Sequence, residues 1–280
     1  MEQYRRNDLT FDVRDAGPAD GPVVVLLHGF PQYNDSWNAV IDRLTAQGYR
    51  CLAPNQRGYS AGARPSRRRD YRIPELVDDL GALIDASGAR QVHLVGHDWG
   101  AAVAWAAAAE MPERLATVSP VSVPHPAAFL KSFLNSRQGL ASWYMYAFQL
   151  PGIPEWSMLR RDGAMLSRSL RQAGQTRAVA ERDAQGMSEP GALTAALNWY
   201  RAMPLSNPRA INQKVSVPTL YVWSDEDVAL MPKAAHNTAR YVTGEYRFEI
   251  MSGVSHWILD EQPDKLADLL LEWFGAHPIH

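Results

Sequence analysis

Apolar residues in this chain follow a strand period and a helix period in turn. Leu9, Phe11 and Val13 alternate with polar residues, a period of two that predicts a half-buried strand. Val23–Leu27 is a continuous apolar run with three β-branched residues, as a strand buried on both faces requires. Further strands are predicted at Tyr49–Ala53, Gln91–Val95, Leu115–Val121, Pro218–Trp223 and Glu245–Met251.

Helices are predicted between these strands. Apolar residues recur every three or four positions after Pro74 and again near the end of the chain, which gives each segment one apolar stripe. The stretch Trp99–Ala109 is rich in alanine, so this helix can lie close against a sheet. Helices are also predicted at Asp35–Gln47 and Pro232–Tyr241. Strands that alternate with helices predict a parallel sheet with helices on both faces.

The alternation stops between residues 125 and 212. This stretch shows no clear strand but has many aromatic residues and several prolines, and we interpret it as a helical insertion. The sequence therefore predicts one α/β core, residues 1–124 and 213–280, interrupted by a helical lid domain, residues 125–212.

Composition and charge narrow the class of protein. The 280 residues are 46% apolar and 21% charged, and the net charge is −2, so no whole-molecule field attracts nucleic acid or anionic lipid. The single cysteine, Cys51, rules out an intrachain disulfide. The N-terminus lacks a signal-peptide core, and the longest apolar run, Ala101–Ala109, is far short of the about 20 residues that cross a bilayer. We expect a soluble cytoplasmic protein that binds neither membrane nor nucleic acid.

The most informative motif is Gly96-His97-Asp98-Trp99-Gly100, which follows a predicted strand and opens a predicted helix. A residue at the centre of such a turn projects above the sheet, and glycines two positions away avoid clashes. An aspartate here could also be a helix N-cap. Because a carboxylate is already an anion at neutral pH, Asp98 can displace a leaving group from a saturated carbon and form an alkyl ester. Water must then attack the carbonyl of that ester, with a histidine as the base.

This motif resembles the nucleophile turn of the epoxide hydrolases in the α/β-hydrolase superfamily, which reads His-Asp-Trp-Gly. The resemblance runs from Leu9 to Phe274, with its landmarks in the expected order. It implies the α/β-hydrolase fold, with a mostly parallel eight-stranded sheet, helices on both faces and a helical lid inserted after strand 6. It also implies an enzyme that needs no cofactor and no metal.

The resemblance implies the base and the acid as well. His256 follows the last predicted strand, where this fold carries its catalytic histidine, and the chain order nucleophile, acid, histidine is satisfied. Asp227 matches the family spacing after the strand Pro218–Trp223 and would hold the imidazole tautomer, with Asp225 as the alternative. The result is an Asp-His-Asp catalytic triad.

The turn His28-Gly29-Phe30-Pro31 follows the apolar strand Val23–Leu27 and resembles the family pattern His-Gly-x-Pro, in which the proline is commonly cis. A glycine lets the backbone approach closely, and the N–H after it can point into the site. By resemblance, the backbone N–H groups of Phe30 and Trp99 form the oxyanion hole.

Two lid segments resemble those in which epoxide hydrolases carry tyrosines that bind the epoxide oxygen. They imply Tyr144, four residues before Phe148, and Tyr200, in the segment Asn198-Trp199-Tyr200-Arg201. A phenol suits this role because its pKa near 10 makes it a neutral donor at pH 7. Tyr146 remains an alternative to Tyr144, since only one of the two can reach the site.

We therefore predict an epoxide hydrolase, a hydrolase acting on ether bonds, which converts a small apolar epoxide to a vicinal diol through an ester on Asp98. Water activated by His256 would hydrolyse that ester. The alternative is a haloalkane dehalogenase with the same nucleophile, in which Trp99 and a lid tryptophan, Trp143 or Trp199, would bind halide. A catalytically silent binding protein would be free to lose the nucleophile, acid or base, all of which are present. We expect a monomer or a homodimer.

Overall fold

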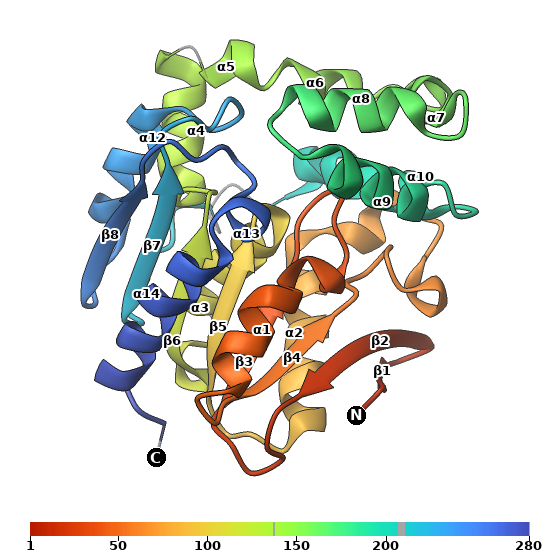
Figure 1. Cartoon of the computed structure of the whole chain (residues 1–280). Helices are drawn as coiled ribbons and strands as arrows, with labels where there is room; N and C mark the ends of the chain where they lie inside the picture. Colours follow the sequence, from red (N-terminus) through yellow and green to blue (C-terminus); the bar gives the residue numbers. More distant parts are fainter. Residues whose placement is uncertain (137, 207–210, 280) are drawn as a thin grey trace.

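The sheet at the centre of the computed structural model, which describes residues 1–136, 138–206 and 211–279, has eight strands. Their order is β1-β2-β4-β3-β5-β6-β7-β8 (Figure 1). β2 pairs antiparallel with both β1 and β4, and every other pair is parallel. The strands are β1 (Gln3–Arg6), β2 (Leu9–Ala16), β3 (Val23–Leu27), β4 (Arg50–Pro54), β5 (Val92–His97), β6 (Leu115–Val121), β7 (Thr219–Ser224) and β8 (Tyr246–Met251).

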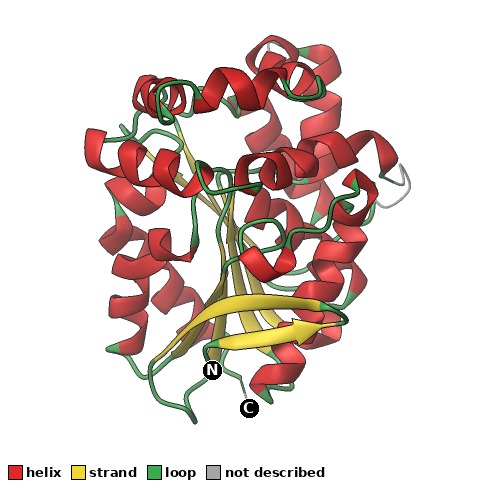
Figure 2. Ribbon diagram, turned by 90° about the vertical axis from the view of Figure 1, so that its right-hand side faces the viewer, coloured by secondary structure: helices red, strands yellow, loops and turns green. Residues whose placement is uncertain are grey.

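Helices pack on both faces of this sheet (Figure 2). The four longest of the core are α1 (Asn38–Thr45), α2 (Ile73–Ser87), α3 (Trp99–Glu110) and α14 (Pro263–Ala276). Val25 and Leu27 of β3 belong to the apolar core that contains α2 and α3. Val24 and Leu26 belong to the second apolar core, which contains α1 and α14. Strand β3 is therefore buried on both faces, as its unbroken apolar run predicts.

Between β6 and β7 the chain forms a run of helices that we call the inserted segment. These helices are α4 (Pro126–Asn135), α5 (Gln138–Ala141), α6 (Trp143–Ala147), α7 (Ile153–Leu159), α8 (Ala164–Gln172), α9 (Arg177–Met187) and α10 (Ala192–Ala202). They lie over the end of the sheet at which β5, β6 and β7 end (Figure 1). The eight-stranded, mostly parallel sheet and the helical insertion after β6 confirm the predicted fold. The exact division at residues 124 and 213 stays a prediction, and positions 137 and 207–210 within the lid lie outside the described residues.

Three local features differ from the sequence-based expectation. Strand β1 is absent from the prediction because Gln3–Arg6 is short and polar, and only Tyr4 is buried, stacked on Phe11 with ring centroids 4.7 Å apart. The helix predicted from Asp35 begins as a 3₁₀ turn, and the one predicted to Tyr241 is α12 (Pro232–Asn237) followed by a 3₁₀ turn.

Within the described ranges, none of the helices has the length and apolar character needed to cross a membrane.

Candidate active site

Asp98 occupies the turn between β5 and α3 in a backbone conformation that residues other than glycine rarely adopt, with φ 50° and ψ −117°. Two glycines make this turn possible by close packing. A Cβ at Gly96 would lie 2.2 Å from the carbonyl oxygen of Gly100, and a Cβ at Gly100 would lie 2.2 Å from that of Leu27. Both distances are far below van der Waals contact. The turn therefore holds the Asp98 side chain at the carboxyl end of the sheet, under the inserted segment.

The loop after β3 contacts the Asp98 carboxylate directly. The Phe30 N–H donates a hydrogen bond to Asp98 Oδ1 at 2.8 Å, and the Phe30–Pro31 peptide bond is cis. Gly29 permits this approach, since a Cβ there would lie 2.3 Å from Asp98 Cβ. The Trp99 N–H, the other half of the predicted oxyanion hole, makes no such bond to the carboxylate among the hydrogen bonds of the described residues, so its role stays a prediction.

His28 supports this loop from beneath. Its Nδ1–H donates to the Gly29 carbonyl at 3.1 Å, and its Nε2 accepts the Gln56 N–H at 3.1 Å. Burial lowers the pKa of His28 to about 4, so the ring is neutral at pH 7 and keeps one donor and one acceptor.

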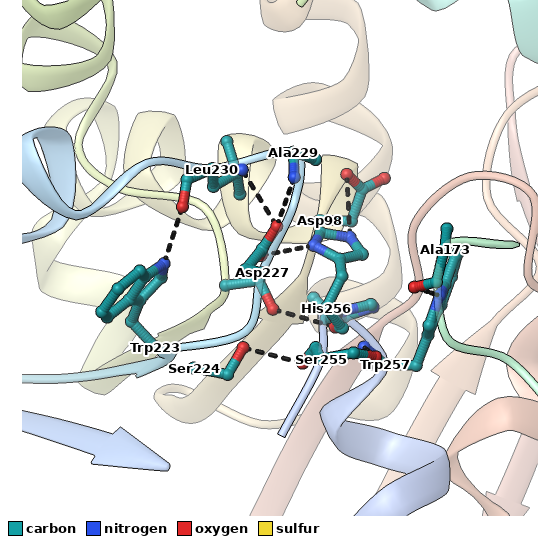
Figure 3. Close-up of polar contacts among 12 residues, drawn as sticks. Asp98, Ala173, Trp223, Ser224, Asp227, Ala229, Leu230, Ser255, His256 and Trp257 are labelled. Carbon is teal, nitrogen blue, oxygen red and sulfur yellow. Dashed lines mark hydrogen bonds and ion pairs between the residues drawn. The ribbon is translucent and has the colours of Figure 1, made fainter. Parts of the chain in front are cut away.

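His256 lies between two carboxylates (Figure 3). Its Nε2 is 3.6 Å from Asp98 Oδ2, and its Nδ1 is 2.7 Å from Asp227 Oδ2. The Asp227 carboxylate also accepts backbone N–H groups at its other oxygen. Asp225, the alternative acid, is exposed and accepts the Gly253 N–H at 2.7 Å instead. The structure thus brings Asp98, His256 and Asp227 together and leaves Asp225 outside.

The backbone of His256 is held from behind by residues of two strand ends. His97 Nε2 lies 2.9 Å from the His256 carbonyl, and Ser122 Oγ donates to the same carbonyl at 3.2 Å. Burial, with the nearby His256 charge, lowers the pKa of His97 to about 4. A neutral His97 with its proton on Nε2 is therefore the form that binds this carbonyl.

Charge near Asp98 and His256 stabilises their ionised forms. Burial acts to raise the pKa of Asp98, but the hydrogen bonding and charge of His256 outweigh it and lower the pKa. Burial likewise acts to lower the pKa of His256, but Asp227 and Asp98 outweigh it and raise the pKa to about 10. An ionised carboxylate is the form in which Asp98 can attack a carbon. None of its polar contacts in the described part of the chain comes from an arginine.

Tyr144 of α6 and Tyr200 of α10 face the site from the inserted segment. Their ring centroids are 6.1 Å apart, and the Tyr200 ring lies 5.0 Å from the Trp99 ring. Burial, and then the Asp98 charge, raises the pKa of both phenols, so both remain neutral donors. Tyr146 points elsewhere: its side chain is 62% exposed and packs against Phe133.

Side chains that the sequence-based reasoning gave no role fix the two tyrosine-bearing helices to each other. Gln149 Nε2 donates to the Tyr200 carbonyl at 2.8 Å, and Arg201 Nε donates to the Phe148 carbonyl at 2.9 Å. Arg201 also forms an ion pair of 2.7 Å with Glu155 of α7. In the sequence, Gln149 and Arg201 are marked only by lying in or beside the tyrosine-bearing segments. Their hydrogen-bond partners could not be predicted, because those contacts depend on how α6, α7 and α10 cross.

Trp143 and Trp199, the two tryptophans considered as halide ligands, do not offer free indole donors to the site. Trp199 Nε1 donates to the Arg57 carbonyl at 2.8 Å, and Arg57 itself is bound to Asp79 through two bonds of 2.7 Å. The Trp143 side chain is 68% exposed. Over the described residues, no group of three or more His, Cys, Asp or Glu side chains is arranged to hold a metal ion.

Comparisons with known proteins agree with this fold. Residues 22–263 match the family model described as alpha/beta hydrolase fold. The chain is 38% identical to "AB hydrolase superfamily protein YfhM" of Bacillus subtilis, over 95% of each chain. It is 33% identical to "Epoxide hydrolase A" of Mycobacterium tuberculosis, covering 95% of this chain and 94% of that protein. The crystal structure of Epoxide Hydrolase A from Mycobacterium thermoresistibile is similar with a TM-score of 0.85 at 26% identity, over 99% of this chain and 98% of the other.

Proposed function

We propose that this chain, which belongs to the α/β-hydrolase fold family and within it to the epoxide hydrolases, hydrolyses a small apolar epoxide to a vicinal diol with Asp98 as the nucleophile. One observation carries the proposal. An ionised carboxylate on a strained turn lies close to one buried tyrosine, Tyr200, and one partly buried tyrosine, Tyr144, which supports attack by a nucleophile while neutral donors bind the leaving oxygen. Opening of a three-membered ring requires such an arrangement, because the nucleophile must attack the carbon of the bond that breaks while a donor binds its oxygen.

In the first half-reaction, an Asp98 oxygen attacks one epoxide carbon and the C–O bond to that carbon breaks. The Tyr144 and Tyr200 hydroxyls bind the oxygen that leaves, and one of them transfers its proton to it. Each such donor is worth about 3 kcal/mol when its hydrogen bond strengthens in the transition state. The products are an alkyl ester on Asp98 and a hydroxyl on the neighbouring carbon.

Formation of the ester changes the charge that His256 meets. Asp98 loses its negative charge, and with it one of the two carboxylates that raise the pKa of His256. His256 can then give up its proton, which neutralises the tyrosinate left by ring opening. The resulting neutral imidazole is the base that the second half-reaction needs.

In the second half-reaction, His256 takes a proton from water as the water oxygen attacks the ester carbonyl of Asp98. Asp227 stabilises the imidazolium that forms. The Phe30 N–H, which contacts Asp98 Oδ1 at 2.8 Å, stabilises the oxyanion, and we propose that the Trp99 N–H joins it. Collapse of the intermediate releases the diol, whose oxygen takes the proton from His256. The Asp98 carboxylic acid that remains then passes its proton to His256, which restores the starting charges.

The rival reaction, dehalogenation of a haloalkane, finds less support in the surroundings of Asp98. A halide would need indole donors from the inserted segment. The Trp199 N–H already donates to the Arg57 carbonyl, and the Trp143 side chain faces solvent. The neutral phenols of Tyr144 and Tyr200 favour an alkoxide over a halide as the group that leaves.

The proposal is tested by a single turnover of styrene oxide in ¹⁸O-labelled water. The diol should be released without label, because its new oxygen comes from Asp98, and the label should be found in the protein at Asp98. A labelled diol in that first turnover would refute the covalent route. Halide release from 1-bromobutane, measured beside diol formation, tests the rival reaction.

A further inference from the structure

The loop that carries the acid, residues 227–231, is bound through its backbone. Asp227 Oδ1 accepts the Ala229 N–H at 2.8 Å and the Leu230 N–H at 2.9 Å (Figure 3). Trp223 Nε1, from the end of β7, donates to the Leu230 carbonyl at 3.1 Å. The position of the Asp227 carboxylate therefore depends on the backbone of this acid loop.

A side chain of the inserted segment binds the same loop. Gln138 of α5 is fully buried, its Nε2 donates to the Ala229 carbonyl at 2.7 Å, and its Oε1 accepts the Met231 N–H at 2.8 Å. The Ser142 hydroxyl accepts a further Nε2–H at 3.0 Å. The amide has one orientation only, because the reverse would place its oxygen against a carbonyl and its N–H₂ against an N–H.

We propose that Gln138 is a positioning residue through which the inserted segment holds Asp227 against His256, and that it acts on hydrolysis of the ester rather than on ring opening. The inference rests on the proposed function. Gln138 spans the acid loop from Ala229 to Met231, and the two N–H groups that bind Asp227 Oδ1 belong to residues 229 and 230 of that loop. A loop released from Gln138 would carry the Asp227 carboxylate away from the imidazole.

Only the second half-reaction should respond strongly. Ring opening uses the Asp98 carboxylate and the phenols, and Asp227 contacts neither. Once Asp98 is an ester, Asp227 is the one carboxylate of the site that still orients His256 and stabilises its protonated form. Gln149, in the same segment, has the complementary role: it binds the carbonyl of Tyr200 and so supports ring opening. The inserted segment thus contains two glutamines that support different half-reactions.

The experiment compares Gln138→Met, Gln149→Met and Gln172→Met, the last at an exposed position of α8. Each protein is mixed with styrene oxide in a quenched single turnover, and the ester on the protein and the diol are measured by mass spectrometry. Gln138→Met should form ester at the wild-type rate and hydrolyse it about tenfold more slowly, the factor that about 1.4 kcal/mol represents, so that ester accumulates. Gln149→Met should slow formation of the ester, and Gln172→Met should match the wild type in both steps.

The pH dependence of hydrolysis separates positioning from a loss of stability alone. Hydrolysis needs neutral His256, and Asp227 raises the pKa of that imidazole. In Gln138→Met the fall in the hydrolysis rate at low pH should therefore move to lower pH, whereas a merely less stable protein would keep the wild-type profile. Gln138→Glu, which keeps the size and the acceptor for the Met231 N–H but loses the donor to Ala229, should show the same accumulation of ester if Gln138→Met fails to fold.

Failure of this inference is distinct from failure of the proposed function. His256→Gln serves as the reference, because it should form ester and not hydrolyse it. If His256→Gln forms no ester, the covalent route is wrong. If it forms ester while Gln138→Met and Gln138→Glu hydrolyse theirs at the wild-type rate and pH dependence, the role of Gln138 is refuted.

Discussion

Replacing Tyr200 by phenylalanine tests whether the phenols open the ring. The ring of residue 200 would keep its edge contacts with Trp99 and Phe148, both at centroid distances of 5.0 Å, and with Phe30 at 5.6 Å. Only the hydroxyl is removed, so the change in unfolding free energy should be about 1 kcal/mol. Loss of one donor to the leaving oxygen costs about 2.7–4 kcal/mol, which predicts a 10²- to 10³-fold slower ring opening.

The assay is ester formation on Asp98 in a single turnover of styrene oxide, in the His256→Gln background so that the ester is not removed. Tyr146→Phe is the matched control, because that side chain is 62% exposed and should leave the rate unchanged. The Tyr144→Phe/Tyr200→Phe double variant should form no measurable ester. Ester formation within threefold of the reference in Tyr200→Phe would show that the oxygen is bound by other groups.

Three further changes probe stability and charge. The pKa of His256 is raised to about 10 in the folded protein, from an ordinary 6.5. Its contribution to stability is therefore complete below pH 6.5 and is lost as the pH rises toward 10. The difference in urea-unfolding free energy between the wild type and His256→Gln should shrink over that range. Glu155→Gln leaves the buried Arg201 guanidinium without its charged partner and should cost about 3 kcal/mol, seen as a lower urea midpoint, whereas an unchanged midpoint would show that the pair is not needed. Gly100→Ala places a Cβ 2.2 Å from the Leu27 carbonyl, so expression of a stable, active protein would contradict the packing described for the nucleophile turn.

The core of the fold could be predicted because each of its buried elements has its own local pattern of apolar residues. Val23–Leu27 and Leu115–Val121 are strands with the same bounds in the sequence pattern and in the structure, since both are buried on two faces and flanked by breaks in the pattern. The strand β1 could not be predicted, because it depends on pairing with β2 rather than on an apolar run of its own. Local periodicity thus identifies buried elements and misses edges.

The candidate site could be predicted where a residue sits at a fixed point of the chain's architecture. Asp98 and His256 follow strands of the sheet, and strand ends converge at one edge of a parallel sheet whatever the rest of the chain does. Gln138 and Glu155 could not be found in this way. Their partners, in the acid loop and in α10, are 91 and 46 residues away in sequence, and only the crossing of helices in the inserted segment brings them into contact.

The outward and inward faces of α6 bear on which length changes the protein could tolerate during evolution. Tyr144 faces Asp98, while its neighbours Trp143 and Tyr146 face solvent. Deleting or adding one residue between Tyr144 and the Phe148 carbonyl that Arg201 holds would rotate Tyr144 by about 100° about the helix axis. Related enzymes that keep the reaction should therefore vary in length before α5 or between α7 and α9, and keep the spacing from Tyr144 to Gln149 unchanged.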